Sequence, residues 1–121
     1  MHPKTTRTSV AAVDETERLL RRLALNDEES VGMVLASGSD AGPAPLLPKV
    51  DLLVQLGALL ALGAATSSLR ATVERAIDAG ATESEIVGVL IAVAPAVGLA
   101  RVVSTAPRLA MAIGYDIEAD E

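Results

Sequence analysis

The stretch from Leu69 to Gly98 constrains the fold more than any other part of the chain, because it encodes a helix that ends at a tight corner. Its apolar residues recur at the spacing that places them on one helical face: Leu69, Val73, Ala76 and Ile77. Gly80 then follows where a residue in the left-handed conformation commonly ends a helix. The pattern predicts an amphipathic helix that stops just before Gly80.

A second helix begins directly after this corner. Thr82 and Glu85 have the spacing of a capping box, in which each side chain accepts a hydrogen bond from the other residue's backbone amide. The apolar stripe of this helix consists of Ile86, Val89, Leu90 and Val93. The whole stretch therefore predicts a helical hairpin.

The N-terminal third of the chain predicts two shorter helices. Residues 1–13 show no periodic stripe and are expected to form a mobile arm. Asp14 and Glu17 form a capping pair that predicts a helix from Asp14 to about Leu25. Asn26 and Glu29 form a second pair, which predicts a helix from Asp27 to about Ser37. In the first of these helices Leu19, Leu20 and Leu23 should face inward. A Gly/Pro-rich loop over residues 38–45 should contain no regular element. The two helices and this loop together form an N-terminal segment over residues 14–45.

Three segments complete the chain around the hairpin. Pro48 suits the first turn of a largely apolar third helix that we expect to reach Ala65, with Gly57 and Gly63 inside it where another helix comes close. Residues 66–68 should form a turn or cap, and Pro95 with Gly98 should end the hairpin before a last helix from about Val97 to Ile113. Residues 116–121 form an acidic tail. The prediction is an all-α bundle of about six helices, with its main domain over residues 46–115.

Composition excludes several functional classes. The 121-residue chain has a formal net charge of −6, which argues against nucleic acid as a partner, and it has no cysteine, which excludes thiolate chemistry, disulfides and cysteine metal sites. We expect no cofactor and no metal. Half of the residues are apolar, yet there is one tyrosine and no phenylalanine or tryptophan, so other subunits should cover part of the apolar surface.

The chain shows no sequence feature of a membrane protein or of a secreted one. The apolar run from Leu52 to Ala65 is shorter than the roughly 20 residues that cross a bilayer. Residues 1–9 lack the apolar run of a secretory signal. We therefore expect no membrane partner and a cytoplasmic location.

Three motifs together resemble the carboxymuconolactone decarboxylase family, which includes the alkylhydroperoxidase-D type proteins. They are Pro48-Lys49 at the start of an apolar helix, the Ala79-Gly80-Ala81-Thr82-Glu83-Ser84-Glu85-Ile86 corner, and Ala94-Pro95-Ala96-Val97-Gly98 followed by Arg101. The resemblance covers about residues 46–115. It implies an all-helical alkylhydroperoxidase-D-like bundle that assembles into homotrimers or hexamers.

The peroxidase chemistry of this family needs residues that the chain lacks. The resemblance places the family's two cysteines on Ala65 and Ser68, its histidine on Thr72 and its glutamate on Leu52 or Leu53. Since the thiolate is the nucleophile that reduces a peroxide, this chain is not expected to be a thiol peroxidase.

The decarboxylase branch also usually carries a histidine at the Thr72 position, and threonine cannot exchange a proton near neutral pH. The resemblance places a pocket between the third helix and the hairpin, with Ser67, Ser68 and Thr72 orienting a small lactone, keto acid or other carboxylate and Arg101 holding its charge. If the chain is active, it should be a decarboxylase-like lyase. Each residue also has a structural explanation: the serines cap a helix, Thr72 bonds a carbonyl one turn earlier, and Arg101 pairs with an acid. The alternative is a non-catalytic assembly or ligand-binding module.

Overall fold

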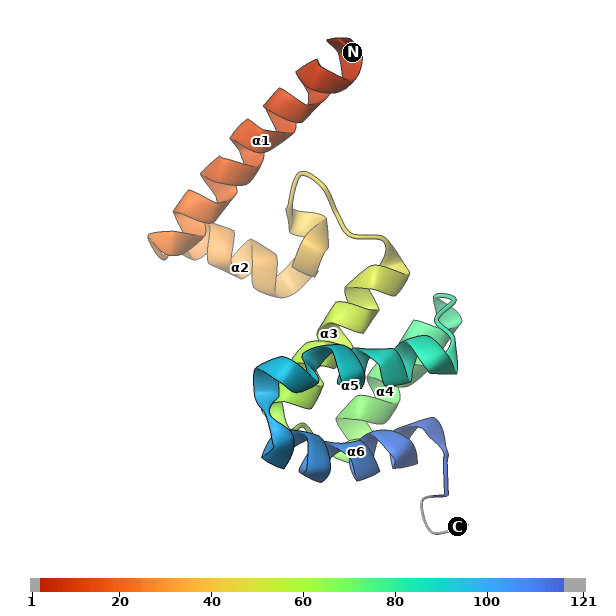
Figure 1. Ribbon diagram of the computed structural model, residues 1–121. Coiled ribbons are helices and arrows are strands. Elements are labelled where there is room, and N and C mark those ends of the chain that lie inside the picture. Colours follow the sequence, from red (N-terminus) through yellow and green to blue (C-terminus); the bar gives the residue numbers. More distant parts are fainter. Residues whose placement is uncertain (1–2, 117–121) are drawn as a thin grey trace. The chain divides into compact units, whose positions relative to one another are not determined.

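The computed structural model describes residues 3–116, with side chains from Val13 onward, and every regular element in that range is helical (Figure 1). This confirms the predicted all-α class. The chain divides into two compact units, Met1–Leu46 and Leu47–Glu121, which are described separately. The acidic tail lies outside the described residues except for Asp116.

The N-terminal unit contains α1 (Pro3–Ala24), α2 (Glu28–Ser37) and the short 3₁₀ helix η1 (Gly38–Ala41). The first helix begins at Pro3 rather than at the predicted Asp14, so the expected arm is helical from that residue onward. No glycine or proline interrupts the chain between Pro3 and Ala24, and the helix therefore has no stop signal there. Glu17 is not a cap but lies inside α1, where it pairs with Arg21 at 2.8 Å.

Two further predictions for this unit are corrected. The N-cap of α2 is Asp27, not Asn26, and its carboxylate accepts from the amide of Ser30 at 3.1 Å and from the Ser30 hydroxyl at 2.6 Å. Asn26 instead has a φ of 58°, in the left-handed region that asparagine tolerates. The expected loop over residues 38–45 begins with η1, so the prediction of no regular element there is wrong for Gly38–Ala41.

Four helices make up the C-terminal unit: α3 (Pro48–Leu62), α4 (Thr66–Asp78), α5 (Glu83–Val97) and α6 (Leu99–Ile113). Helix α3 packs on α4 and α5, and α6 packs on the same two helices, so the four close a ring around one core (Figure 1). The buried apolar residues come from all four helices and the α4–α5 corner: Leu52, Leu56, Leu60, Leu69, Val73, Ala76, Ala81, Ile86, Leu109 and Ala112.

The hairpin forms as its sequence predicts. Thr82 and Glu85 make both hydrogen bonds of the capping box, at 3.0 and 2.9 Å, and Gly80 has a φ of 103° at the corner. One core prediction fails, because Ile77 is 43% exposed at the edge of α4. In the N-terminal unit Leu20 is likewise exposed rather than inward-facing.

Three other helix boundaries in this unit differ from the prediction: the end of α3, the start of α4 and the end of α5. Helix α3 ends at Leu62 because Gly63 takes the left-handed conformation, with a φ of 70°, so Gly63 is a C-cap and not an interior residue. Ala65 rather than a serine is the N-cap of α4, which begins at Thr66. Pro95 lies inside the last turn of α5, and the break falls at Gly98. None of the described helices is long and apolar enough to cross a membrane.

Candidate functional site

The predicted site residues lie on two helices of the C-terminal unit, α4 and α6. Ser67 and Ser68 are exposed in the first turn of α4, and Thr72 is buried one turn further on, at 7% exposure. Arg101 lies at the start of α6, exposed, and the cavity beside it is lined by none of the other three. Arg101 thus lines a cavity without the other three residues, and a pocket around all four stays a prediction.

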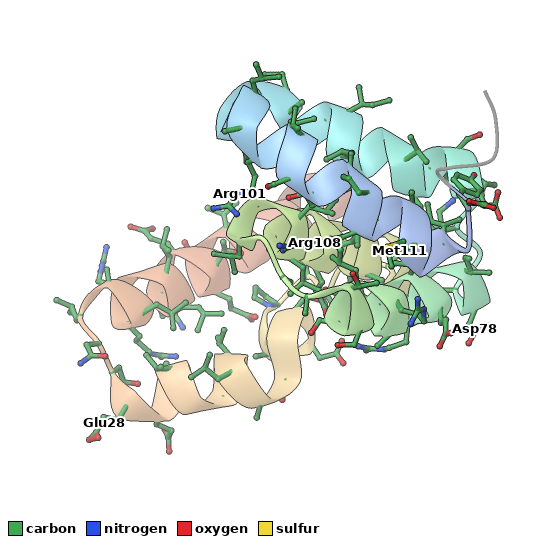
Figure 2. The ribbon with its side chains drawn as sticks, turned by 90° about the horizontal axis from the view of Figure 1, so that it is seen from below. Glu28, Asp78, Arg101, Arg108 and Met111 are labelled. Carbon is green, nitrogen blue, oxygen red and sulfur yellow. The ribbon has the colours of Figure 1, made fainter. Side chains whose placement is uncertain are left out.

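Two arginines of α6 meet the end of α3. Arg101 and Arg108 are seven residues apart, which places them on one face of α6, and Figure 2 shows both beside the α3–α4 connection. The Nη1 atom of Arg108 donates to the carbonyl oxygens of Gly63, at 2.8 Å, and of Ala64, at 3.4 Å. Arg101 lays its guanidinium against Gly63 in the space that a side chain there would occupy.

The two arginines lie at the C-terminal end of α3 for an electrostatic reason. The C-terminal end of α3 carries partial negative charge on its last carbonyl groups, and arginine side chains stabilise such an end. Among the described residues no carboxylate lies within 4.0 Å of either guanidinium. The Arg108 guanidinium is occupied by the two carbonyl oxygens, whereas the Arg101 guanidinium makes no hydrogen bond to any described residue. Arg101 therefore remains able to bind an anion.

A cavity of about 370 Å³ lies beside Arg101 and is lined by Val97, Ala100, Arg101 and Ser104. The Ser104 hydroxyl donates to the backbone oxygen of Arg101 at 3.2 Å and keeps its lone pairs as acceptors. The lining thus offers one positive charge, one hydroxyl and aliphatic surface. It contains no carboxylate or imidazole that could exchange a proton near neutral pH.

An apolar groove with a volume of about 500 Å³ lies between α3 and α5. It is lined only by aliphatic residues and glycine: Val50, Leu53, Val54, Gly57, Ala58, Val89, Ala92 and Val93. The position that a Cβ would take at Gly57 is 3.4 Å from a methyl carbon of Val89 and of Val93, so the two helices approach closely there, as the glycine predicts. We call this opening the α3–α5 groove.

The titratable groups with shifted pKa values belong to the scaffold. The amide of Thr82 donates to Glu85 and, with the Lys49 ammonium 3.1 Å away, holds the pKa of that carboxyl below its ordinary value. The Glu83 carboxylate, 2.8 Å from the Tyr115 hydroxyl, raises the pKa of the phenol. Both pairs, Lys49–Glu85 and Glu83–Tyr115, lie at the surface and join chain segments that are far apart in sequence. We find no group of metal-ligating side chains among the described residues.

Sequence reasoning missed Arg108 and the role of Gly63. The signal for Arg108 was present, because it follows Arg101 by two helical turns. The signal for Gly63 was ambiguous, since a glycine near the end of an apolar helix fits both an interior contact and a C-cap.

Comparison with known proteins gives one match. The family model described as the carboxymuconolactone decarboxylase family matches residues 32–110, from the middle of α2 to the last turn of α6. Neither the curated proteins nor the solved structures contain a match to the chain.

Proposed function

The chain belongs to the carboxymuconolactone decarboxylase family, and from this premise we propose that it binds a small carboxylate, a keto acid or a lactone acid, without catalysing its decarboxylation by proton transfer. The observation that carries this proposal is the lining of the cavity beside Arg101. A guanidinium is the side chain best suited to a carboxylate, because its planar fork can donate two parallel hydrogen bonds. The volume of about 370 Å³ is within the range of small-ligand sites.

The absence of turnover follows from the side chains around this cavity. Positioned acids and bases contribute a factor of roughly 10² to 10⁴ to a reaction, and neither an arginine nor a serine can supply it near neutral pH. Thr72 stands where the family resemblance expects a histidine, and it is buried in α4 away from the cavity lining. A thiol peroxidase is excluded by the cysteine-free sequence.

Binding can be tested with levulinate, a small keto acid, and with the neutral lactone γ-valerolactone. We expect calorimetry to detect levulinate only, and Arg101→Gln to weaken its binding about tenfold, corresponding to about 1.4 kcal/mol. Arg75→Gln, an exposed arginine of α4, is the matched control. Equal binding by the Arg101→Gln variant would refute the site, and release of carbon dioxide from a lactone acid that the protein accelerates would refute the lack of catalysis.

We also propose that the chain self-associates, as a trimer or hexamer, which the family resemblance implies. The α3–α5 groove supports this proposal, because its lining is aliphatic and includes the exposed side chains of Val50 and Val54. Native mass spectrometry of the purified protein should show three or six copies. A monomer at micromolar concentration would overturn the proposal.

A further inference from the structure

The N-terminal unit contains a cavity of about 250 Å³ whose walls come from three segments of the chain. Helix α1 contributes Glu15, Arg18, Leu19 and Arg22, α2 contributes Met33, and residues 41–43 complete the lining. The position that a Cβ would take at Gly42 is 3.9 Å from a methyl carbon of Leu19, so the segment after η1 packs on α1 there. The cavity therefore lies where these segments meet within one unit.

Backbone hydrogen bonds of the unit itself hold these walls in place. The amide of Asp27 donates to the carbonyl oxygen of Arg22 at 2.9 Å and fixes the corner between α1 and α2. The amide of Gly42 donates to the carbonyl oxygen of Ser39 at 3.1 Å, and the amide of Leu46 donates to the Ser39 hydroxyl at 3.2 Å. The cavity is thus a pre-formed feature of the unit, as ligand sites usually are.

The positive charges of the cavity come from Arg18 and Arg22. They are four residues apart, so they lie on the same face of α1, where like charges repel each other. Neither guanidinium makes a hydrogen bond or an ion pair with any described residue, and both side chains are exposed, so a ligand can reach them. Arg21, which lies between them in sequence, is outside the lining and pairs with Glu17 at 2.8 Å.

The neighbouring carboxylates do not neutralise this pair. Glu17 is engaged by Arg21, and Asp27 accepts from the amide and the hydroxyl of Ser30 at 3.1 and 2.6 Å. Glu15 is the one carboxylate in the lining, against two guanidinium groups. The last turn of a helix favours an arginine, which accounts for Arg22, but Arg18 lies one turn earlier. The lining therefore keeps an excess of positive charge that the described part of the unit does not use.

We propose that this cavity binds inorganic phosphate or a small phosphate monoester between Arg18 and Arg22. A phosphate group carries three acceptor oxygens on one atom, so the planar forks of both arginines can donate to it, whereas one fork already occupies both oxygens of a carboxylate. Leu19 and Met33 offer aliphatic contact to a short organic group. The volume lies just below the roughly 300–1,000 Å³ of drug-sized sites, which favours a compact ligand. This site is independent of the Arg101 cavity, which belongs to the other unit.

Calorimetry at constant ionic strength, with inorganic phosphate and glycerol 3-phosphate as probes and acetate for comparison, tests the proposal. We expect both phosphates to bind more tightly than acetate, and Arg18→Gln and Arg22→Gln each to weaken their binding about tenfold. Arg21→Gln is the matched control, because it removes the same charge from the same helix outside the lining, and it should leave the affinity unchanged. An equal loss in Arg21→Gln would show a response to net charge alone and would overturn the proposal, as would acetate that binds as tightly as phosphate.

Two further variants test the position of the ligand. Glu15→Gln removes the negative charge of the lining and should strengthen phosphate binding about threefold, so an unchanged or weaker affinity would contradict the proposed position. Arg101→Gln should leave phosphate binding unchanged, which separates this site from the carboxylate site proposed above. Binding to phosphatidylcholine vesicles that contain phosphatidic acid, without binding of the two soluble phosphates, would overturn the proposal of a soluble ligand.

Discussion

The same substitution, glycine to alanine, should have opposite effects at Gly63 and Gly88. Gly63 has a φ of 70°, where a side chain costs about 1–2 kcal/mol, and its new Cβ would displace the exposed end of the Arg101 side chain at little further cost. Gly88 lies inside α5 with no atom within 4 Å of the position of a Cβ, so alanine there should gain about 1 kcal/mol of helix stability. The two variants should therefore differ by about 2–3 kcal/mol in free energy of unfolding.

Urea unfolding followed by circular dichroism measures this difference, with all proteins at one concentration because self-association shifts apparent stability. Because the exposed Arg101 side chain can turn away from a Cβ at Gly63, Gly63→Ala should cost about the same in the Arg101→Ala background. An increase in stability for Gly63→Ala would refute the left-handed cap that Gly63 forms at the end of α3.

Three further predictions concern two buried residues of the core and the Glu85 carboxylate at the surface. Thr105→Val should raise the free energy of unfolding by about 1–2 kcal/mol in thermal unfolding, because the Thr105 hydroxyl is fully buried and has no hydrogen-bond partner. Leu56→Ala should lower it by about 2–5 kcal/mol, since the Leu56 side chain is fully buried in the core. The pKa of Glu85 is lowered in the folded state by the Thr82 amide and by Lys49, so this group stabilises the fold above its unfolded pKa and the contribution disappears as the pH falls through the folded pKa. An acid titration of stability should accordingly be flatter in Glu85→Gln below about pH 4.

The parts of the fold that depend on residues close together in the sequence were predicted correctly. The capping box of Thr82 and Glu85, the corner at Gly80 and the Gly57 contact each follow from residues within one or two turns of one another. The start of α1 could not be placed, because the Asp14–Glu17 spacing imitates a cap inside a continuous helix. The choice between Asn26 and Asp27 depended on a backbone angle that the residue types alone do not fix.

The site was less predictable, because it depends on contacts between helices. Arg101 was identified, but its neighbours come from the ends of α3 and α5 and from its own helix, and they do not include Ser68 or Thr72. Periodicity assigned Ile77 to the core, although the packing of α4 against α3 and α6 leaves it at the edge. The neighbouring helices decide which of two adjacent apolar residues is buried. The apolar pattern of one helix does not contain that information.

The scaffold explains how a family member can lack the family's ionisable site residues and keep its fold. The capping box fixes the start of α5, the Lys49–Glu85 ion pair joins α3 to α5, and the core is built from aliphatic side chains, mostly leucine. Thr72 fills its buried position as a short side chain, so the protein needs no charge there for packing. Because stability and chemistry depend on different residues, family membership establishes the bundle and leaves the function to the surfaces that remain open. In this chain those surfaces include the cavity lined by Arg101 and Ser104 and the aliphatic α3–α5 groove.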